Sequence, residues 1–102
     1  MFALHRGGKL EVRSKISLTQ KTLSSVYTPG VAEVCREIFR HPQKSFDYTI
    51  KKNSVAVVTD GSRVLGLGNI GAEASLPVME GKALLFKELA GIDAFPLALN
   101  TQ

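Results

Sequence analysis

Apolar residues recur at helical spacing between residues 77 and 90 and predict an amphipathic helix there. Pro77 fits the first turn of this helix, where its missing N–H costs nothing. Lys87 points away from the apolar face, toward solvent. Lys82 instead lies near the middle of that face, among the large apolar residues Val78, Leu85, Phe86 and Leu89.

Lys82 is the unusual residue of this helix, because it stands where a leucine is typical. One interpretation is structural: the aliphatic stem packs and the ammonium group reaches water. The other is chemical: burial disfavours a charged amine, and a neutral amine can act as a general base. The chemical interpretation requires a cavity beside Lys82. The spacing alone leaves both interpretations open.

A second helix is predicted over residues 29–40, with Thr28 as its cap and Pro29 at its first position. Its apolar positions repeat at helical spacing and include Cys35, which we interpret as an inert core thiol. Tyr27 lies just before the cap. A phenol there is either an apolar staple or a proton donor favoured by the positive end of the helix dipole.

Strands alternate with these helices. Short helical turns at 45–52 lead into an apolar strand at 55–59. Asp60-Gly61 is typical of a two-residue hairpin, which predicts a return strand at 62–66. A last strand is expected at 92–99, with Gly91 capping the helix before it. The fold class is therefore α/β: a small sheet with a β-hairpin and packed helices.

The strand exit at residues 66–71, GLGNIG, has three glycines spaced as in a dinucleotide fingerprint: Gly66, Gly68 and Gly71. Two features weaken that interpretation. First, the strand before the glycines is predicted to be part of a hairpin, whereas the fingerprint requires a βαβ unit. Second, the fingerprint has an acidic residue at the end of the next strand, whereas Asp93 stands at the beginning of that strand. The alternative is a glycine-rich turn that packs closely or faces a small anion.

Arg63 belongs to the predicted return strand, next to the glycines. A strand arginine is commonly a solvated edge charge. Its planar fork would equally suit bidentate binding of a carboxylate. The sequence supports both roles.

Composition restricts the class of protein. With 102 residues the chain forms one small domain at most, and a hydrophobic content of 44% supports a core. The net charge of +4 is spread along the chain without interleaved aromatic residues, so we expect no nucleic-acid partner. One cysteine excludes an internal disulfide, and the N-terminus lacks a long apolar segment. We therefore expect a cytoplasmic protein that does not bind a membrane.

Several long motifs resemble the N-terminal domain of malic enzyme, of the shorter type typical of prokaryotes. They are YTPGVAEVCREI, which begins at Tyr27, and DGSRVLGLGNIGAEASLPVMEGKALLFKELAGIDAFPLAL, which begins at Asp60. The resemblance runs from about Leu10 to Leu99. It implies an enzyme that oxidises and decarboxylates L-malate to pyruvate and CO2 with NAD or NADP and with Mg2+ or Mn2+.

The same resemblance implies residue roles. Tyr27 matches the general acid that protonates enolpyruvate, and Lys82 matches the general base that takes the hydroxyl proton. Arg63 matches the arginine that binds a malate carboxylate, and the glycine segment with Gly68 lies beside the substrate. Dinucleotide binding is expected in a later domain, so the cofactor-binding residues are unknown and GLGNIG is not the main fingerprint.

The resemblance also implies that the acidic metal ligands and the dinucleotide domain lie beyond Gln102. We therefore expect no metal site in these residues and no turnover by the chain alone. Residues 1–20 are interpreted as an arm lying on the partner of a homodimer, and 21–102 as the truncated domain. The alternatives are a non-enzymatic interaction module of the same fold and a nucleotide-binding module that uses GLGNIG.

Overall fold

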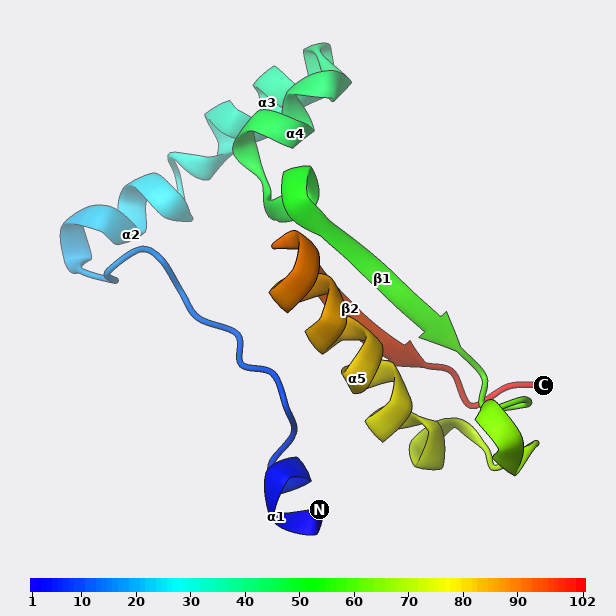
Figure 1. Cartoon of the computed structure of the whole chain (residues 1–102). Coiled ribbons are helices and arrows are strands. Elements are labelled where there is room, and N and C mark those ends of the chain that lie inside the picture. Colours follow the sequence, from blue (N-terminus) through cyan, green and yellow to red (C-terminus); the bar gives the residue numbers. More distant parts are fainter. The chain divides into compact units, whose positions relative to one another are not determined.

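The computed structural model describes residues 1–102, which form two compact units (Figure 1). The first unit combines Met1–Glu11 with Asn53–Gln102, and the second is Val12–Lys52. Each unit is described by itself below. The predicted arm of residues 1–20 contributes to both units, and its boundary at residue 20 stays a prediction.

The first unit is built on two parallel strands joined by a long helix. β1 (Ser54–Thr59) pairs with β2 (Asp93–Ala98) in a register that runs from Ser54 opposite Asp93 to Thr59 opposite Ala98. Between them the chain forms the 3₁₀ turn η3 (Leu65–Leu67) and α5 (Ala72–Ala90). A four-residue helix, α1 (Phe2–His5), lies near the N-terminus. The strands predicted at 55–59 and 92–99 are confirmed, and so is the α/β class.

The predicted hairpin at Asp60-Gly61 is wrong, because β1 pairs with β2 and residues 62–66 form no strand. The Asp60 side chain accepts a hydrogen bond from the Ser62 amide at 2.9 Å, which makes a local turn instead. The chain then curls on itself, with the Val64 amide donating to the Gly68 carbonyl at 2.9 Å. An Asp-Gly pair therefore turns the chain here without returning it along β1.

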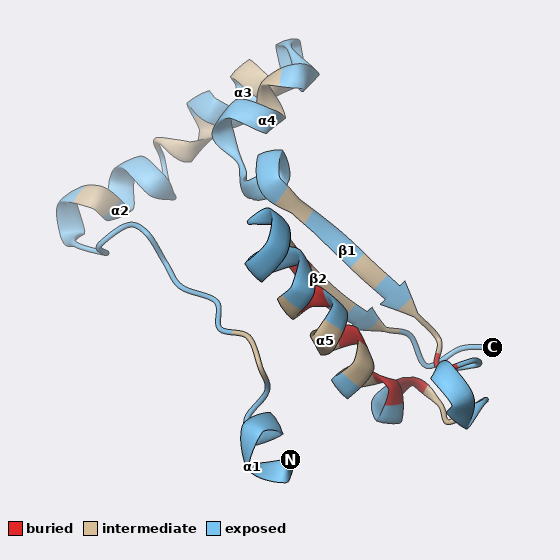
Figure 2. Ribbon diagram, viewed as in Figure 1, coloured by how far each residue is buried: buried red, intermediate tan, exposed pale blue.

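α5 packs on the sheet through a stripe of small residues, mainly against β2. Ala83 is fully buried, and Ala94 of β2 and Val64 of the loop are buried as well. Figure 2 shows the buried positions along α5 in red. Small side chains let the helix axis approach the strands closely. The buried positions of α5 are Ala72, Ser75, Met79 and Ala83.

The buried positions show that the predicted packing face of α5 is wrong. The side chains of Leu85 and Leu89 are 58% and 81% exposed, and Lys82 is exposed as well. The prediction weighted large apolar residues, whereas the packing face is set by small ones. The helix also starts five residues before Pro77, which lies inside it rather than in its first turn.

The C-terminal end of α5 follows the sequence prediction. Gly91 caps the helix in the left-handed region, with φ of 67°, and its amide donates to the Lys87 carbonyl at 2.9 Å. A polar cluster then fixes the start of both strands. Asn53 donates to the Gly91 carbonyl at 2.8 Å, and Lys87 donates to the Asp93 carboxylate at 2.7 Å. The lysine and asparagine hydrogen bonds hold the pKa of Asp93 below its usual range.

The second unit is helical and has no buried residue. Its elements are α2 (Gln20–Val26), α3 (Val31–Arg40), η1 (Pro42–Lys44), α4 (Ser45–Tyr48) and η2 (Ile50–Asn53), the last residue of which belongs to the first unit. The turns predicted at 45–52 are confirmed. The helix predicted from residue 29 begins at Val31, with Gly30 as its cap in place of Thr28. Cys35 is exposed, so its interpretation as a core thiol is wrong.

α2 was not predicted, although its start is marked in the sequence. The Thr19 hydroxyl accepts from the Thr22 amide at 3.1 Å, and the Thr22 hydroxyl accepts from the Thr19 amide at 2.8 Å. This reciprocal pair is a capping box in which a threonine replaces the usual Glu or Gln. The substitution hides the motif from a search for the common pattern.

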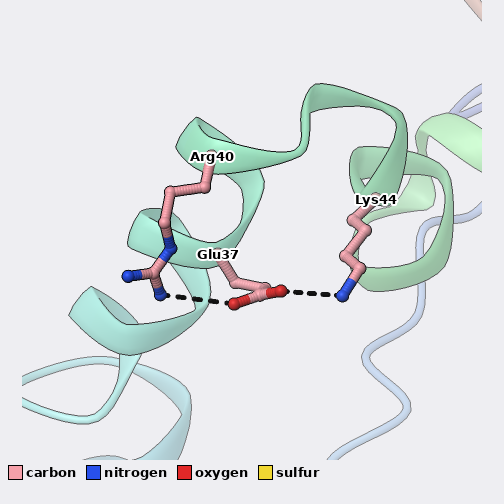
Figure 3. A network of polar contacts seen from close by, with 3 residues as sticks. All are labelled: Glu37, Arg40 and Lys44. Atoms are coloured by element: carbon pink, nitrogen blue, oxygen red, sulfur yellow. Dashed lines mark hydrogen bonds and ion pairs between the residues drawn. The ribbon is translucent and has the colours of Figure 1, made fainter.

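An exposed network of charges joins α3 to η1 (Figure 3). One Glu37 oxygen accepts from Lys44 Nζ at 2.7 Å, and the other accepts from Arg40 at 3.3 Å. The hydrogen bond and charge of Lys44 hold the pKa of Glu37 below its usual range, and Glu37 in turn raises the pKa of Lys44. The network therefore fastens the turn that follows α3.

Candidate functional site

The candidate site of the first unit lies at the carboxyl ends of its two strands. Because β1 and β2 are parallel, Thr59 and Ala98 end at the same edge of the sheet. The loop from Asp60 to Gly71 leaves this edge and leads into the first turn of α5. Ligands of open α/β sheets bind at this edge, where loops and helix N-termini gather.

Gly61 closes that loop at its base. Its carbonyl accepts hydrogen bonds from the amides of Ile70 and Gly71, both at 3.1 Å. Gly61 has φ of 73° and is buried, and a Cβ atom there would collide with the Gly71 carbonyl. Only glycine fits, so both ends of the loop are held together by its backbone. The Asp-Gly pair predicts only a hairpin residue at Gly61, and no local pattern indicates its contact with Gly71.

Two of the predicted site residues lie together on the loop. The hydrogen bond between Val64 and Gly68 places Gly68 against the residue that follows Arg63. Arg63 and Gly68 are both exposed, and Gly68 is surrounded by open space, with φ of 74°. The Arg63 guanidinium forms no hydrogen bond or ion pair within the chain. It is therefore available to an anionic ligand.

A shallow depression of about 360 Å³ lies where the loop enters α5. Gly71 caps the helix without a side-chain hydrogen bond, and Asn100 contributes from beyond β2. Next to it, the side-chain amides of Asn69 and Gln102 pair reciprocally at 2.9 Å. The depression is lined by Ile70, Gly71, Ala72, Glu73, Ala74 and Asn100.

Lys82 lies on α5, roughly 15 Å along the helix from Ala72 at about 1.5 Å per residue. It does not line the depression, so the predicted cavity beside Lys82 is not found there. Its ammonium group forms no hydrogen bond or ion pair within the chain. Lys9 and Lys87, by contrast, each donate to an oxygen of the first unit. Lys82 and Arg63 are thus both exposed cations without a partner.

Tyr27 belongs to the second unit and is 65% exposed. Its amide donates to the Leu23 carbonyl at 2.9 Å and closes α2, while its carbonyl accepts from the amide of Val31, the first residue of α3, at 2.7 Å. Tyr27 therefore lies between the negative end of the α2 dipole and the positive end of the α3 dipole. Its catalytic role stays a prediction.

The glycine segment now has a different context from the predicted one. β1, α5 and β2 form a parallel βαβ unit, which removes the hairpin as an objection to a dinucleotide fingerprint. The spacing is still unusual, because Gly66 stands seven residues beyond the end of β1 and lies in η3. Asp93 begins β2, as expected, and so cannot supply the acid at a strand end.

No three His, Cys, Asp or Glu side chains converge in a way that could hold a metal ion. The residues present therefore do not form a metal-ligand set, and we derive no chemical step through a metal.

None of the helices combines the length and apolar character needed to cross a bilayer.

Comparison with known proteins identifies similar sequences and structures. Residues 7–102 match the malic enzyme N-terminal domain. The NAD-dependent malic enzyme of Geobacillus stearothermophilus is 60% identical over 102 residues, covering 99% of this chain and 21% of that protein. The NADP-dependent malic enzyme of Haemophilus influenzae is 54% identical over 94 residues, which cover 91% of this chain and 12% of that protein.

A solved structure agrees with these matches. The crystal structure of an NAD-dependent malic enzyme from Thermotoga maritima aligns with a TM-score of 0.92 at 51% identity, covering 98% of this chain and 27% of that one. The chain spans about a fifth of the length of the Geobacillus relative.

Proposed function

Because this chain belongs to the malic enzyme family, as its N-terminal domain, we propose that it supplies substrate-binding and proton-transfer residues for the oxidative decarboxylation of L-malate. The products are pyruvate and CO2. The observation that carries the proposal is the pair of exposed, unpartnered cations, Arg63 and Lys82, in a unit whose other lysines, Lys9 and Lys87, each have a hydrogen-bond partner. Malate is a dianion and needs such groups.

Arg63 binds one malate carboxylate through its guanidinium fork. The loop that carries it is closed by Gly61, so the side chain starts from a fixed backbone. Gly68, with open space above it, lets the substrate approach the backbone beside Arg63. These residues bind and orient malate.

Lys82 takes the proton of the malate hydroxyl as the alcohol is oxidised. We expect the bound substrate to remove Lys82 from water, and loss of water favours the neutral amine that a base requires. Tyr27 then protonates enolpyruvate after CO2 has left.

The cofactor is NAD or NADP, since relatives of both kinds are similar to this chain. We assign hydride acceptance and metal binding to no residue of this chain.

We further propose a homodimer. At Lys9 the N-terminal segment lies on the chain's own α5, so only the remainder of residues 1–20 is proposed to lie on a partner. A strictly monomeric mass at high micromolar concentration would contradict the dimer.

The decisive experiment replaces Lys82 with alanine in the malic enzyme whose N-terminal domain these residues form. Loss of the general base should lower kcat by about 10²–10⁴-fold and change KM for malate far less. Lys87→Ala is the matched control on the same helix. It breaks only the exposed pair with Asp93 and should leave kcat unchanged.

Two other outcomes have defined meanings. A defect confined to KM would make Lys82 a charge clamp for malate instead of a base. Unchanged turnover in Lys82→Ala would refute the assignment of Lys82 as the general base. A damaged Lys87→Ala beside it would show that the wrong lysine of α5 was chosen.

A further inference from the structure

The N-terminal segment is fastened to the middle of α5 by Lys9. The Lys9 amide donates to Glu80 Oε1 at 3.2 Å, and Lys9 Nζ donates to the Pro77 carbonyl at 2.7 Å. One residue therefore holds both ends of a single helical turn. Lys9 is half-buried, whereas every residue before it is exposed. The contact is thus the point at which this segment is anchored.

Two glycines lie at this contact. A Cβ atom would lie 3.4 Å from Glu80 Oε2 at Gly8 and 3.9 Å from Lys9 Nζ at Gly81, which are ordinary van der Waals distances. Space therefore does not require glycine at either position. At Gly8 the backbone does favour glycine, because its φ of 90° is one that other residues rarely adopt.

The turn that Lys9 holds follows a weak point of α5. Pro77 has no N–H, so the Glu73 carbonyl lacks the hydrogen bond that an α-helix normally supplies. Helices bend most easily at such a proline. The Lys9 contacts begin at Pro77 and end at Glu80, and Lys82 lies two residues farther on. Any bend at Pro77 would displace Lys82.

We propose that Lys9 is a positioning residue for Lys82, which it holds in place by clamping the turn from Pro77 to Glu80. The proposal rests on the function proposed above, because the position of Lys82 matters only if Lys82 acts on a substrate. Lys9 itself touches no substrate. Its influence passes through α5.

The first test measures amide hydrogen exchange in the 102-residue chain. Lys9→Met removes the ammonium group and keeps the aliphatic stem, so exchange should speed up at the amides of residues 78–83. Lys15→Met is the control, because Lys15 is an exposed lysine with no contact. Should Lys9→Met fail to fold, Glu80→Ala removes one half of the clamp and should accelerate the same amides less. Unchanged exchange in both variants would overturn the clamp.

The second test measures kinetics in the malic enzyme. Misplacement of Lys82 should lower kcat of Lys9→Met by about 5- to 100-fold and leave KM for malate nearly unchanged. Lys9→Arg, which keeps a cationic donor, should recover most of the loss. A merely structural role would lower the melting temperature without changing kcat per folded enzyme.

The two proposals fail in different ways. Faster exchange with unchanged kcat would overturn the positioning role and leave the proposed function intact, provided that Lys82→Ala is inactive. Full turnover in Lys82→Ala would remove the proposed function, and the role of Lys9 with it, whatever the exchange data show.

Discussion

The two units of this chain are stabilised in different ways. The first has a buried core between α5 and the strands, and it carries Arg63, Gly68 and Lys82. The second has no buried residue and carries Tyr27. The charges differ too: Val12–Lys52 has eight basic and three acidic residues, against five and six in the first unit. The second unit therefore combines self-repulsion with the absence of a core.

The difference shows where structural precision comes from. In the first unit, long-range contacts fix the elements: the parallel pairing of β1 with β2, the small-residue stripe and the Gly61 hydrogen bonds. In the second, local contacts do so: the Thr19–Thr22 capping box and the Glu37 network. The carboxylate binding proposed for Arg63 needs a loop with a fixed backbone, which the Gly61 hydrogen bonds provide.

The largest effect is expected when Gly61 is replaced. Gly61→Ala places a Cβ against the Gly71 carbonyl and forces a left-handed alanine. We expect it to lower the free energy of unfolding by more than about 2 kcal/mol, measured by urea denaturation. The amides of residues 61–71 should lose protection, while the helices of the second unit keep theirs.

Gly66→Ala is the matched control for Gly61. A Cβ at Gly66 meets no atom within 4 Å, and its φ lies outside the left-handed region. The free energy of unfolding should change by no more than about 0.5 kcal/mol. If the two variants were equally stable, the loop would not be closed by Gly61.

A smaller effect is expected in the second unit, from Glu37→Gln. Because the folded-state pKa of Glu37 is depressed, its contribution to stability is present above the unfolded pKa and is lost as pH falls through the folded pKa. Acidification below about pH 4 should therefore loosen α3 and η1 in the unmodified chain. Glu37→Gln should lack this acid transition, as read from the amide chemical shifts of residues 41–44.

Glu33→Gln provides the comparison for Glu37. Glu33 lies on the same helix but forms no ion pair with a neighbouring side chain. Its replacement should leave the acid response of residues 41–44 intact. An identical response in all three proteins would show that the network in Figure 3 does not stabilise the turn.

Local signals explain which elements the sequence could predict. The apolar run of β1, the Gly91 cap and the turns near Ser45 are short-range features, and each was predicted correctly. The parallel partner of β1 lies beyond a whole helix, so no local pattern indicates it. The phase of α5 was wrong because periodicity favours large apolar residues, whereas Ala72 and Ala83 form the contact.

The candidate site was predicted more through family resemblance than through physical reasoning. Resemblance selected Tyr27, Arg63 and Lys82. The physical argument offered for Lys82, its burial, is contradicted by the structure, whereas Tyr27 lies between the ends of two helices and its dipole argument stays untested. Gly61 and Lys9 were not recognised, because their roles depend on contacts with Gly71 and Pro77 that are distant in sequence.

Residue-resolved hydrogen exchange of the intact chain tests most directly the claim that the proposed substrate-binding residues Arg63, Gly68 and Lys82 lie in the only unit with a buried core. We predict that the slowest amides lie in β1, α5 and β2, together with those of Ile70 and Gly71 that bind the Gly61 carbonyl. Amides of α2 and α3 should exchange at least about tenfold faster, because they open without disrupting a core. Amides in α3 as slow as those in α5 would contradict the account.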